Sequence, residues 1–303
     1  MSKITITLLF LLMFVNNSSG GFSITEENDV FAPNNKDHYY TQGLELDYIS
    51  NISQDNDKFY QYTYGLKNVF YTPSDKDVAT NQPYDRPWAG ITALKYGTTR
   101  YLDREFINGE WMLGVTGPWS YSEDIQKIVH KLIGSGDPKG WTNQIPNEVV
   151  LNYTIGVYNQ LYMLGNYKGF SLDLSSIYGG SIGTAFDYAN VGALFRMGYN
   201  VPKLYELKIA PTISPYLDKF SFYTFAEADE KLTLHNITID GSWFQDSPHQ
   251  NLRPLYTDMD VGAALAYDWF KLSYMMNYRT KEFYGQEDIS HYGTIIISFA
   301  KNF

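Results

Sequence analysis

Strict alternation of apolar and polar side chains recurs along the chain in segments of about ten residues or more. In residues 151–161 the odd positions are apolar except Asn159, and residues 259–269 repeat the pattern with apolar side chains at every odd position. A period of two residues is typical of a β-strand. Strands of soluble sandwiches average only about five or six residues, whereas a tilted strand that crosses a membrane needs about nine to eleven. The alternation therefore favours a transmembrane β-barrel.

About twelve segments have this strand-like character, an even number that would return both chain ends to one side of the membrane. Short turns at 51–57 and 165–168 alternate with long loops near 71–84, 117–147, 242–254 and 284–290, which is typical of outer-membrane barrels. Residues 201–217 contain three prolines, so we expect a turn excursion there. The expected strands are 22–28, 39–50, 58–69, 86–101, 105–115, 148–161, 168–178, 184–198, 218–240, 255–268, 270–283 and 291–303.

The N-terminal segment of the chain and its composition predict an exported membrane protein. Residues 1–20 have a lysine, a short apolar run and a small polar stretch, so we predict a signal peptide followed by a single barrel domain at 21–303. Aromatic residues make up 17% of the chain and most are tyrosine, which suits a membrane–water boundary. There are no cysteines to form disulfides or bind metals, and the net charge of -10 disfavours nucleic acid as a partner.

The loop at 117–147 interrupts the alternation with a helical pattern. Ser120 and Glu123 have the spacing of a capping box, and Gly134 supplies a stop. Gln126 and His130 lie one turn apart, at the edge of an apolar face. The fold predicted from the residues is therefore an antiparallel all-β barrel with one short helix in an outer loop. That apolar face, which must lie against the barrel wall or lipid, consists of Ile125, Ile128, Val129 and Leu132.

Several motifs give the chain a specific resemblance. They are ENDVFAP, YYTQGL, DRPWAGI, GVTGPWS, QKIVHKLIGSGDPKGWTNQIPNE and ITIDGSWF, in this order with the last near 237–244. Together they are similar to the outer-membrane lipid A 3′-O-deacylase family over essentially the whole expected mature chain. The resemblance implies a twelve-stranded barrel with its active site between the wall and an outer-loop helix. It also implies a histidine that activates water, a bound calcium that stabilises the oxyanion, and an acyl ester of lipid A as substrate.

The resemblance assigns roles to individual residues. His130 matches the general base, with Gln126 beside it, and Asn28 and Asp29 match the polar pair of the site. Thr41 matches the site threonine. Asn28 and Asp29 also have a simpler interpretation, an Asx turn at the end of a strand.

Calcium is the implied cofactor. The residues themselves favour a hard cation, because Glu27, Asn28, Asp29 and Thr41 cluster oxygen atoms. By periodicity Thr41 shares the lumen-facing side of its strand with Glu45 and Asp47. The predicted metal ligands are Asp29 and Thr41 with one further acid, Asp137 as first choice and Glu148 as second, while Gly136 stands where some relatives carry a charge.

Two basic residues are candidate ligands for lipid phosphates. Arg86 suits a phosphate bidentately, and Lys95 is the second candidate. A salt bridge at the barrel rim is the competing interpretation of both.

These features predict an outer-membrane enzyme of a Gram-negative bacterium, in contact with lipopolysaccharide and other membrane lipids, as a monomer or weak homodimer. Two alternatives stay open: an outer-membrane phospholipase with serine–histidine chemistry, and a non-enzymatic channel or structural barrel. The stretch Gly179–Gly183 fits the G-x-S-x-G pattern of a serine nucleophile. Because a further strand follows Ser181 instead of a helix, we interpret the stretch as a glycine-rich hairpin.

Overall fold

The computed structural model describes residues 20–32, 39–50, 53–55, 58–80, 82–102, 104–165, 169–202, 220–267 and 269–301. The expected signal peptide, apart from Gly20, and nearly all of the excursion at 201–217 lie outside these ranges. Among the helices in them, none is long and apolar enough to cross a membrane.

The described strands form one antiparallel sheet that closes on itself, because β1 pairs with both β2 and β13 and β2 also pairs with β4. The short β3 pairs with β4 in continuation of β2, so the thirteen strands make a wall of twelve and the predicted barrel is confirmed. The strands are β1 (Gly20–Asn28), β2 (Tyr39–Ser50), β3 (Ser53–Asp55), β4 (Lys58–Thr72), β5 (Ala89–Tyr101), β6 (Glu105–Thr116), β7 (Val149–Gly165), β8 (Phe170–Gly183), β9 (Phe186–Tyr199), β10 (Ser221–Asn236), β11 (Leu255–Tyr267), β12 (Phe270–Arg279) and β13 (Ser290–Lys301).

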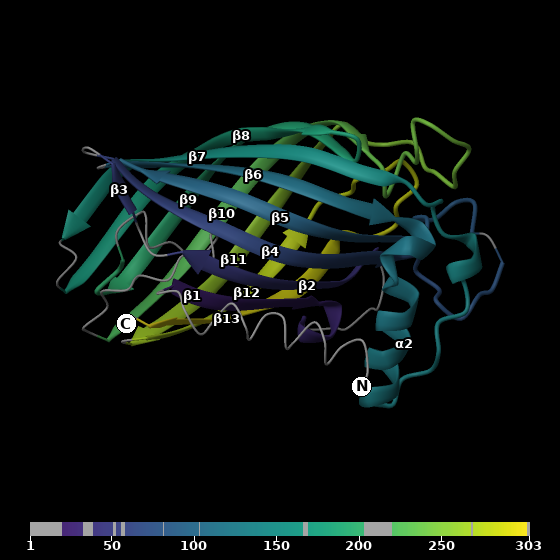
Figure 1. Ribbon diagram of the computed structural model, residues 1–303, viewed down its shortest axis with the longest axis horizontal. Helices are drawn as coiled ribbons and strands as arrows, with labels where there is room; N and C mark the ends of the chain where they lie inside the picture. Colours follow the sequence, from purple (N-terminus) through teal and green to yellow (C-terminus); the bar gives the residue numbers. More distant parts are fainter. Residues whose placement is uncertain are drawn as a thin grey trace.

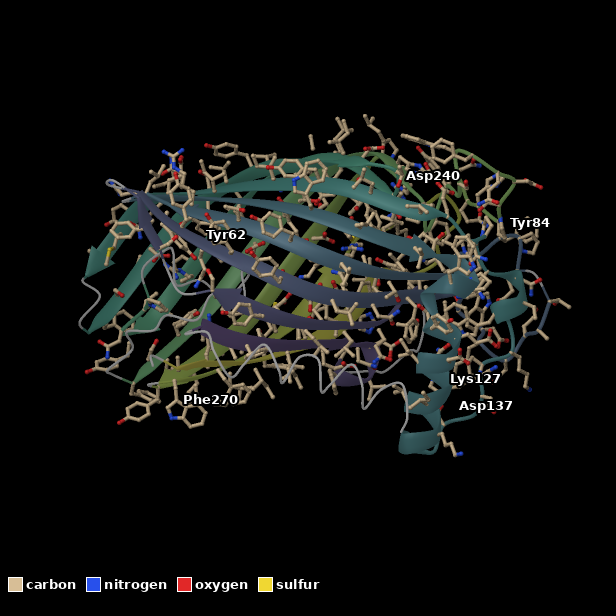
Figure 2. All side chains as sticks on the ribbon, viewed as in Figure 1. Tyr62, Tyr84, Lys127, Asp137, Asp240 and Phe270 are labelled. Carbon is tan, nitrogen blue, oxygen red and sulfur yellow. The ribbon has the colours of Figure 1, made fainter. Side chains whose placement is uncertain are left out.

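The long loops gather at one end of the barrel, together with the helical segments. Figure 1 shows α2 at this end and β3 at the other. Tyr84 belongs to the loop end and Phe270 to the opposite end (Figure 2). By the usual asymmetry of these barrels the loop end is the outer one. The helical segments are η1 (Asp29–Phe31), η2 (Gly117–Ser120), α2 (Ser122–Ile133) and η3 (Trp141–Asn143).

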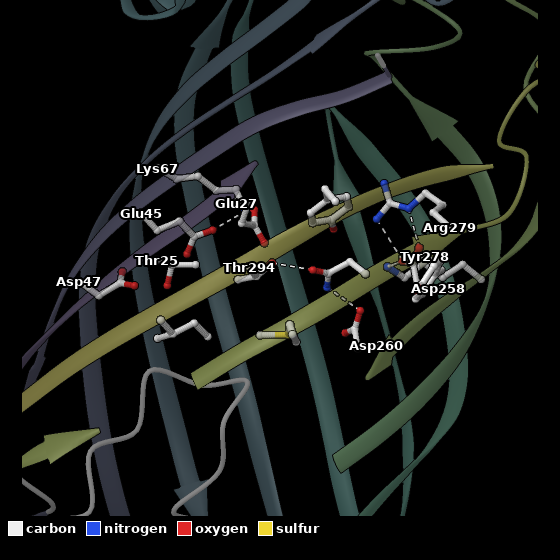
Figure 3. Close-up of a pocket in the computed structure, with 15 residues that line it drawn as sticks. Thr25, Glu27, Glu45, Asp47, Lys67, Asp258, Asp260, Tyr278, Arg279 and Thr294 are labelled. Carbon is white, nitrogen blue, oxygen red and sulfur yellow. Dashed lines mark hydrogen bonds and ion pairs between the residues drawn. The ribbon is translucent and has the colours of Figure 1, made fainter. Parts of the chain in front are cut away.

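The two faces of the wall differ as a membrane barrel requires. The lumen holds a cavity of about 370 Å³ lined by charged side chains, among them Glu27, Glu45, Lys67 and Asp258 (Figure 3). The opposite face exposes large apolar side chains, including Leu94, Trp111, Leu113, Leu151, Val191 and Val261. Polar side chains therefore point inward and apolar ones toward lipid.

Several strand ends differ from the expected ones. The glycine-rich stretch is not a hairpin, because Gly179–Gly183 continues β8 and the turn follows at 184–185. Ser181 lies within this strand, where its hydroxyl contacts Asn152 Nδ2 at 3.0 Å and Thr154 Oγ1 at 2.9 Å. It is therefore not on the strand-to-helix turn that a nucleophile elbow needs.

Candidate active site

The N-terminal end of α2 is fixed to the lipid-facing side of the wall. Asn68 Nδ2 on β4 donates to Ser122 Oγ at 3.0 Å, and Thr92 Oγ1 on β5 donates to the Ser120 carbonyl at 2.6 Å. Thr92 has the same strand phase as the exposed Leu94, so this contact is made on the outer face. A Cβ at Gly90 would lie 2.4 Å from Ser122 Oγ, so glycine allows the close approach.

The start of the helix differs from the expected capping box. Tyr121 is the N-cap residue, with a left-handed φ of 56° and no side-chain capping hydrogen bond. Ser120 ends the preceding turn η2, and its hydroxyl donates to the Gly117 carbonyl at 2.7 Å. Glu123 instead pairs with Lys127 at 2.6 Å, a hydrogen bond that raises the pKa of the Lys127 ammonium. The predicted stop is confirmed, because Gly134 caps the helix with φ 74°.

The helix turns a polar row toward the barrel. Ser122, Gln126 and His130 are buried at intervals of four residues, whereas Ile128 is 48% exposed. Ile125 packs against a cluster of aromatic side chains beside the wall. Of the apolar face, Ile125 therefore packs on that cluster and Ile128 faces the exterior, while the polar row faces the space between the helix and the wall.

A cavity of about 480 Å³ lies along this polar row. Its lining comes from β1, η1, β2, β4, α2 and the segments after β4 and α2. Five of the residues predicted for the site meet there: Asn28, Asp29, Thr41, Gln126 and His130. The lining also includes Val30, Gln42, Phe70, Lys76, Val129 and Ser135.

The contact of His130 with a backbone carbonyl determines the tautomer of its neutral ring. His130 is 5% exposed, and its Nδ1 lies 2.5 Å from the carbonyl oxygen of Gly136. Because a carbonyl oxygen only accepts hydrogen bonds, Nδ1 carries the proton in the neutral ring. Nε2 then keeps its lone pair, so the neutral imidazole has an available proton acceptor.

Gln126, one turn before His130, is held by an aromatic neighbour. Its Oε1 accepts a hydrogen bond of 2.7 Å from Trp141 Nε1. Gln126 is 1% exposed, and within the described ranges its Nε2 has no hydrogen-bond partner. The amide therefore brings a donor without a protein acceptor to the cavity lining.

Thr41 reaches the cavity because of a β-bulge, and the expectation that it faces the lumen is wrong. The register of β2 against β4 shifts between Tyr40 and Gln42, which leaves Thr41 outside the regular alternation. Tyr40 points inward and donates to Glu27, while Thr41 lines the cavity under α2 and contacts Thr72 Oγ1 at 2.8 Å. A bulge places two residues of one strand opposite one residue of its partner, so the side chains on either side of the bulge no longer follow one alternation between the two faces of the wall.

The polar pair at the end of β1 has both a structural and a lining role. Asn28 Oδ1 accepts from the Val30 amide at 2.9 Å and caps η1, which is the Asx-type turn. Asp29 is 2% exposed and lines the cavity. Glu27 does not belong to this group of oxygens, because it lines the lumen cavity on the other side of the wall.

Neither candidate for the second acidic ligand lines the cavity. Asp137 is exposed beyond the end of α2 (Figure 2). Glu148 is buried just before β7, and neither of its carboxylate oxygens has a hydrogen-bond partner in the described ranges. Those ranges hold no group of three or more His, Cys, Asp and Glu side chains arranged to hold a metal.

Arg86 and Lys95 are occupied elsewhere and are not retained as phosphate ligands. The buried Arg86 guanidinium donates to Glu282 Oε2 and to Thr238 Oγ1, both at 2.7 Å, so the salt-bridge interpretation applies. Lys95 points into the lumen, where it pairs with Glu45 Oε2 at 2.6 Å and Asp47 Oδ1 at 3.2 Å. The wall separates it from the cavity under α2.

Some lining residues were not predicted from the sequence. Ser122 does not line the cavity, but it continues the buried row of Gln126 and His130 at a spacing of four, which is a signal that the sequence carries. Val30, Phe70 and Ser135 lie on different elements and carry no such pattern. Only the closed barrel brings them together.

The chain is similar to known outer-membrane proteins along nearly its whole length. The model of a family described as outer membrane protein LpxR matches residues 4–301. The solved structure of LpxR from Salmonella typhimurium is 20% identical, with a TM-score of 0.80, and the match covers 93% of this chain and 100% of that one. The β domain of the Bordetella autotransporter BrkA is 7% identical, with a TM-score of 0.46 over 94% of this chain and 99% of that one. A comparison with curated protein sequences gives no match.

Proposed function

Since the chain belongs to the outer membrane protein LpxR family, we propose that it is an ester hydrolase that acts on lipid A. Its location in the outer membrane follows from that family and from the closed twelve-stranded barrel. The proposed reaction removes the 3′-linked acyl or acyloxyacyl chain of lipid A in lipopolysaccharide. The acyl position is taken from the family resemblance.

The position of His130 is the observation that carries the proposal. Its ring lines a cavity between α2 and the lipid-facing side of the wall, not the lumen. A substrate that stays in the membrane can approach this side laterally, whereas a solute passing through the barrel would meet the lumen. Val30, Phe70 and Val129 give the same cavity apolar surface, which suits an acyl chain.

We assign general-base catalysis to His130. Nε2 takes a proton from water as the water oxygen attacks the ester carbonyl carbon. The bond from that carbon to the sugar oxygen then breaks, and the proton passes from His130 to that leaving oxygen, which becomes the sugar hydroxyl. The products are a free fatty acid and a lipid A hydroxyl. We propose that Gln126 Nε2 donates to the carbonyl oxygen as that oxygen gains negative charge, because Gln126 lines the cavity and this donor has no hydrogen-bond partner in the described ranges.

The oxygen atoms at the cavity fit a hard cation such as calcium. Asp29 offers a carboxylate, Thr41 a hydroxyl and Asn28 a side-chain amide, all from residues that line the cavity. Calcium accepts such irregular oxygen ligands, whereas magnesium demands a near-ideal octahedron. Bound there, the ion would supply positive charge beside the reacting carbonyl. We propose Asp29 and Thr41 as its ligands.

A serine–histidine phospholipase is the second candidate, because Ser135 lines the same cavity as His130. The two mechanisms differ in what they require. Water attack needs no serine, so Ser135→Ala should keep the rate, whereas a serine nucleophile would make this variant inactive.

Mass analysis of lipid A tests the function. The chain and its His130→Ala variant would be expressed in a Gram-negative host whose lipid A keeps its 3′ acyl chains. We expect lipid A to lose that acyl group only with the unaltered chain. A change in glycerophospholipids would support the phospholipase instead, and unchanged lipids would support a channel or structural barrel.

A further inference from the structure

The orientation of the Gln126 amide is determined by its neighbour. Trp141 Nε1 lies 2.7 Å from the Gln126 side-chain atom assigned as oxygen. An indole nitrogen is a donor only, so an amide nitrogen at that position would place two donors against each other. The oxygen must therefore face Trp141, and the amide nitrogen takes the other branch.

This arrangement leaves an unused donor in a buried place. Gln126 Nε2 carries two N–H groups, and within the described ranges no acceptor lies within hydrogen-bond distance. A buried donor without a partner is unfavourable for the folded protein. Such groups persist where a ligand supplies the acceptor, and Gln126 lines the cavity proposed for the ester.

We propose that Trp141 is a positioning residue, which holds the Gln126 amide with its N–H groups available to the substrate carbonyl. The inference rests on the proposed ester hydrolysis. Trp141 acts through Gln126 and does not itself line the cavity. Without the indole donor, the amide can rotate and present its oxygen, which would repel the developing negative charge.

Trp141 is itself rigidly placed. It is 1% exposed and packs against Trp88, at 5.1 Å between ring centroids, and against Phe70, at 5.9 Å. Ile145 N donates to the Trp88 carbonyl at 2.9 Å, which ties the segment after Trp141 to the start of β5. A Cβ at Gly140 would lie 2.3 Å from Trp88 Nε1, so glycine is needed for this packing. The indole therefore cannot follow a rotating amide.

The same cluster offers a matched control. Trp88 is 2% exposed and belongs to the same group of side chains, but its Nε1 has no hydrogen-bond partner in the described ranges. Trp88→Phe and Trp141→Phe therefore remove the same atoms from the same environment. Only the second removes a hydrogen bond to Gln126.

Steady-state kinetics on purified lipid A separate the two roles. Trp141→Phe should lower kcat about three- to tenfold with KM nearly unchanged, as expected for one lost hydrogen bond. Trp88→Phe should stay within about twofold. Gln126→Leu should lower kcat about a hundredfold, and adding Trp141→Phe to it should cost nothing further. Equal losses in both tryptophan variants, or losses that multiply in the double variant, overturn the inference.

A measurement without substrate keeps the inference separate from the proposed function. The six tryptophans can be labelled with ¹⁵N at the indole nitrogen and observed by NMR in lipid nanodiscs, with Trp141 assigned from its Phe variant. We expect the Trp141 indole proton to exchange slowly and its signal to shift in Gln126→Leu, with Trp88 little changed. A Trp141 signal that Gln126→Leu does not shift overturns the inference whatever the substrate. Absent lipid A hydrolysis with the expected shift would reject the proposed function alone.

Discussion

The cation proposed for the cavity should bind weakly. Of the described residues that line the cavity, one, Asp29, carries a carboxylate, and Lys76 brings a positive charge to the same lining. Calcium affinity rises with the number of charged ligands, and extracellular sites bind in the range of about 10⁻⁴ to 10⁻³ M. We therefore expect half-maximal activation at about 0.1 to 1 mM calcium instead of micromolar.

Two perturbations test this site. Excess chelator should abolish lipid A hydrolysis by the purified enzyme, and calcium should restore it better than magnesium. Asp29→Ala should lower the rate by at least about 10² to 10³, the usual loss when one oxyanion-stabilising group is removed. Asp137→Asn and Glu148→Gln are matched controls, because neither residue lines the cavity.

The assay is release of fatty acid from lipid A in mixed micelles, titrated with each cation after chelation. A full rate in excess chelator would refute the cation site and leave Asn28 and Asp29 with the role of an Asx-type turn at the end of β1. A large loss of rate in Glu148→Gln but not in Asp29→Ala would show that Glu148, and not Asp29, supplies the carboxylate that the cation needs.

The remaining predictions concern catalysis and stability. Ser135→Ala and Ser181→Ala should each hydrolyse lipid A within about twofold of the unaltered rate; loss of activity in either would revive a serine mechanism. Glu282→Ala should lower the free energy of unfolding by about 3 to 5 kcal/mol, because it leaves the buried Arg86 guanidinium without its carboxylate. Denaturant unfolding in lipid measures this, and an unchanged midpoint would contradict it. Tyr121→Gly should raise stability by about 1 kcal/mol in the same assay, because φ at Tyr121 is 56°; a lower midpoint would indicate that the exposed ring contributes more than the strain costs.

The barrel was predictable because its requirements are local. A strand that separates lipid from a polar lumen must alternate along its whole length, and the alternation is visible residue by residue. The strand at 39–50 was predicted at the bounds that β2 has. The strand at 270–283 was too long, since β12 ends at Arg279 and the following residues join the Arg86–Glu282 contact between loops.

The helix was predictable at its end but not at its start. Gly134 is a stop signal in any setting, and it caps α2 with a left-handed conformation. Ser120 has the spacing of a capping residue and its hydroxyl accepts from the Ser122 amide at 3.3 Å, but that hydroxyl also donates to the Gly117 carbonyl and the N-cap residue is Tyr121. The sequence shows the glycine stop directly, but it does not show that the separate turn η2 precedes the helix and includes Ser120.

The faces of the site residues depended on a feature that periodicity does not show. The alternation along β2 predicted that Thr41 faces the lumen. The bulge between Tyr40 and Gln42 shifts the strand register, and Thr41 lines the cavity under α2 instead. Arg86 and Lys95 illustrate the related difficulty with charges. Their partners Glu282 and Glu45 lie far away in the sequence, and only the closed barrel brings each pair together.

The rate of water-dependent ester hydrolysis by His130→Ala tests the central claim most directly. Purified barrels of this variant and of His249→Ala, an exposed loop histidine on the same end, would be compared after heat-modifiability shows that both are folded. Loss of a general base costs about 10² to 10⁴ in rate, so we expect fatty-acid release from lipid A to fall by at least about 10² in His130→Ala and to be unchanged in His249→Ala. Lipid A hydrolysis at the unaltered rate by a folded His130→Ala barrel would contradict the account.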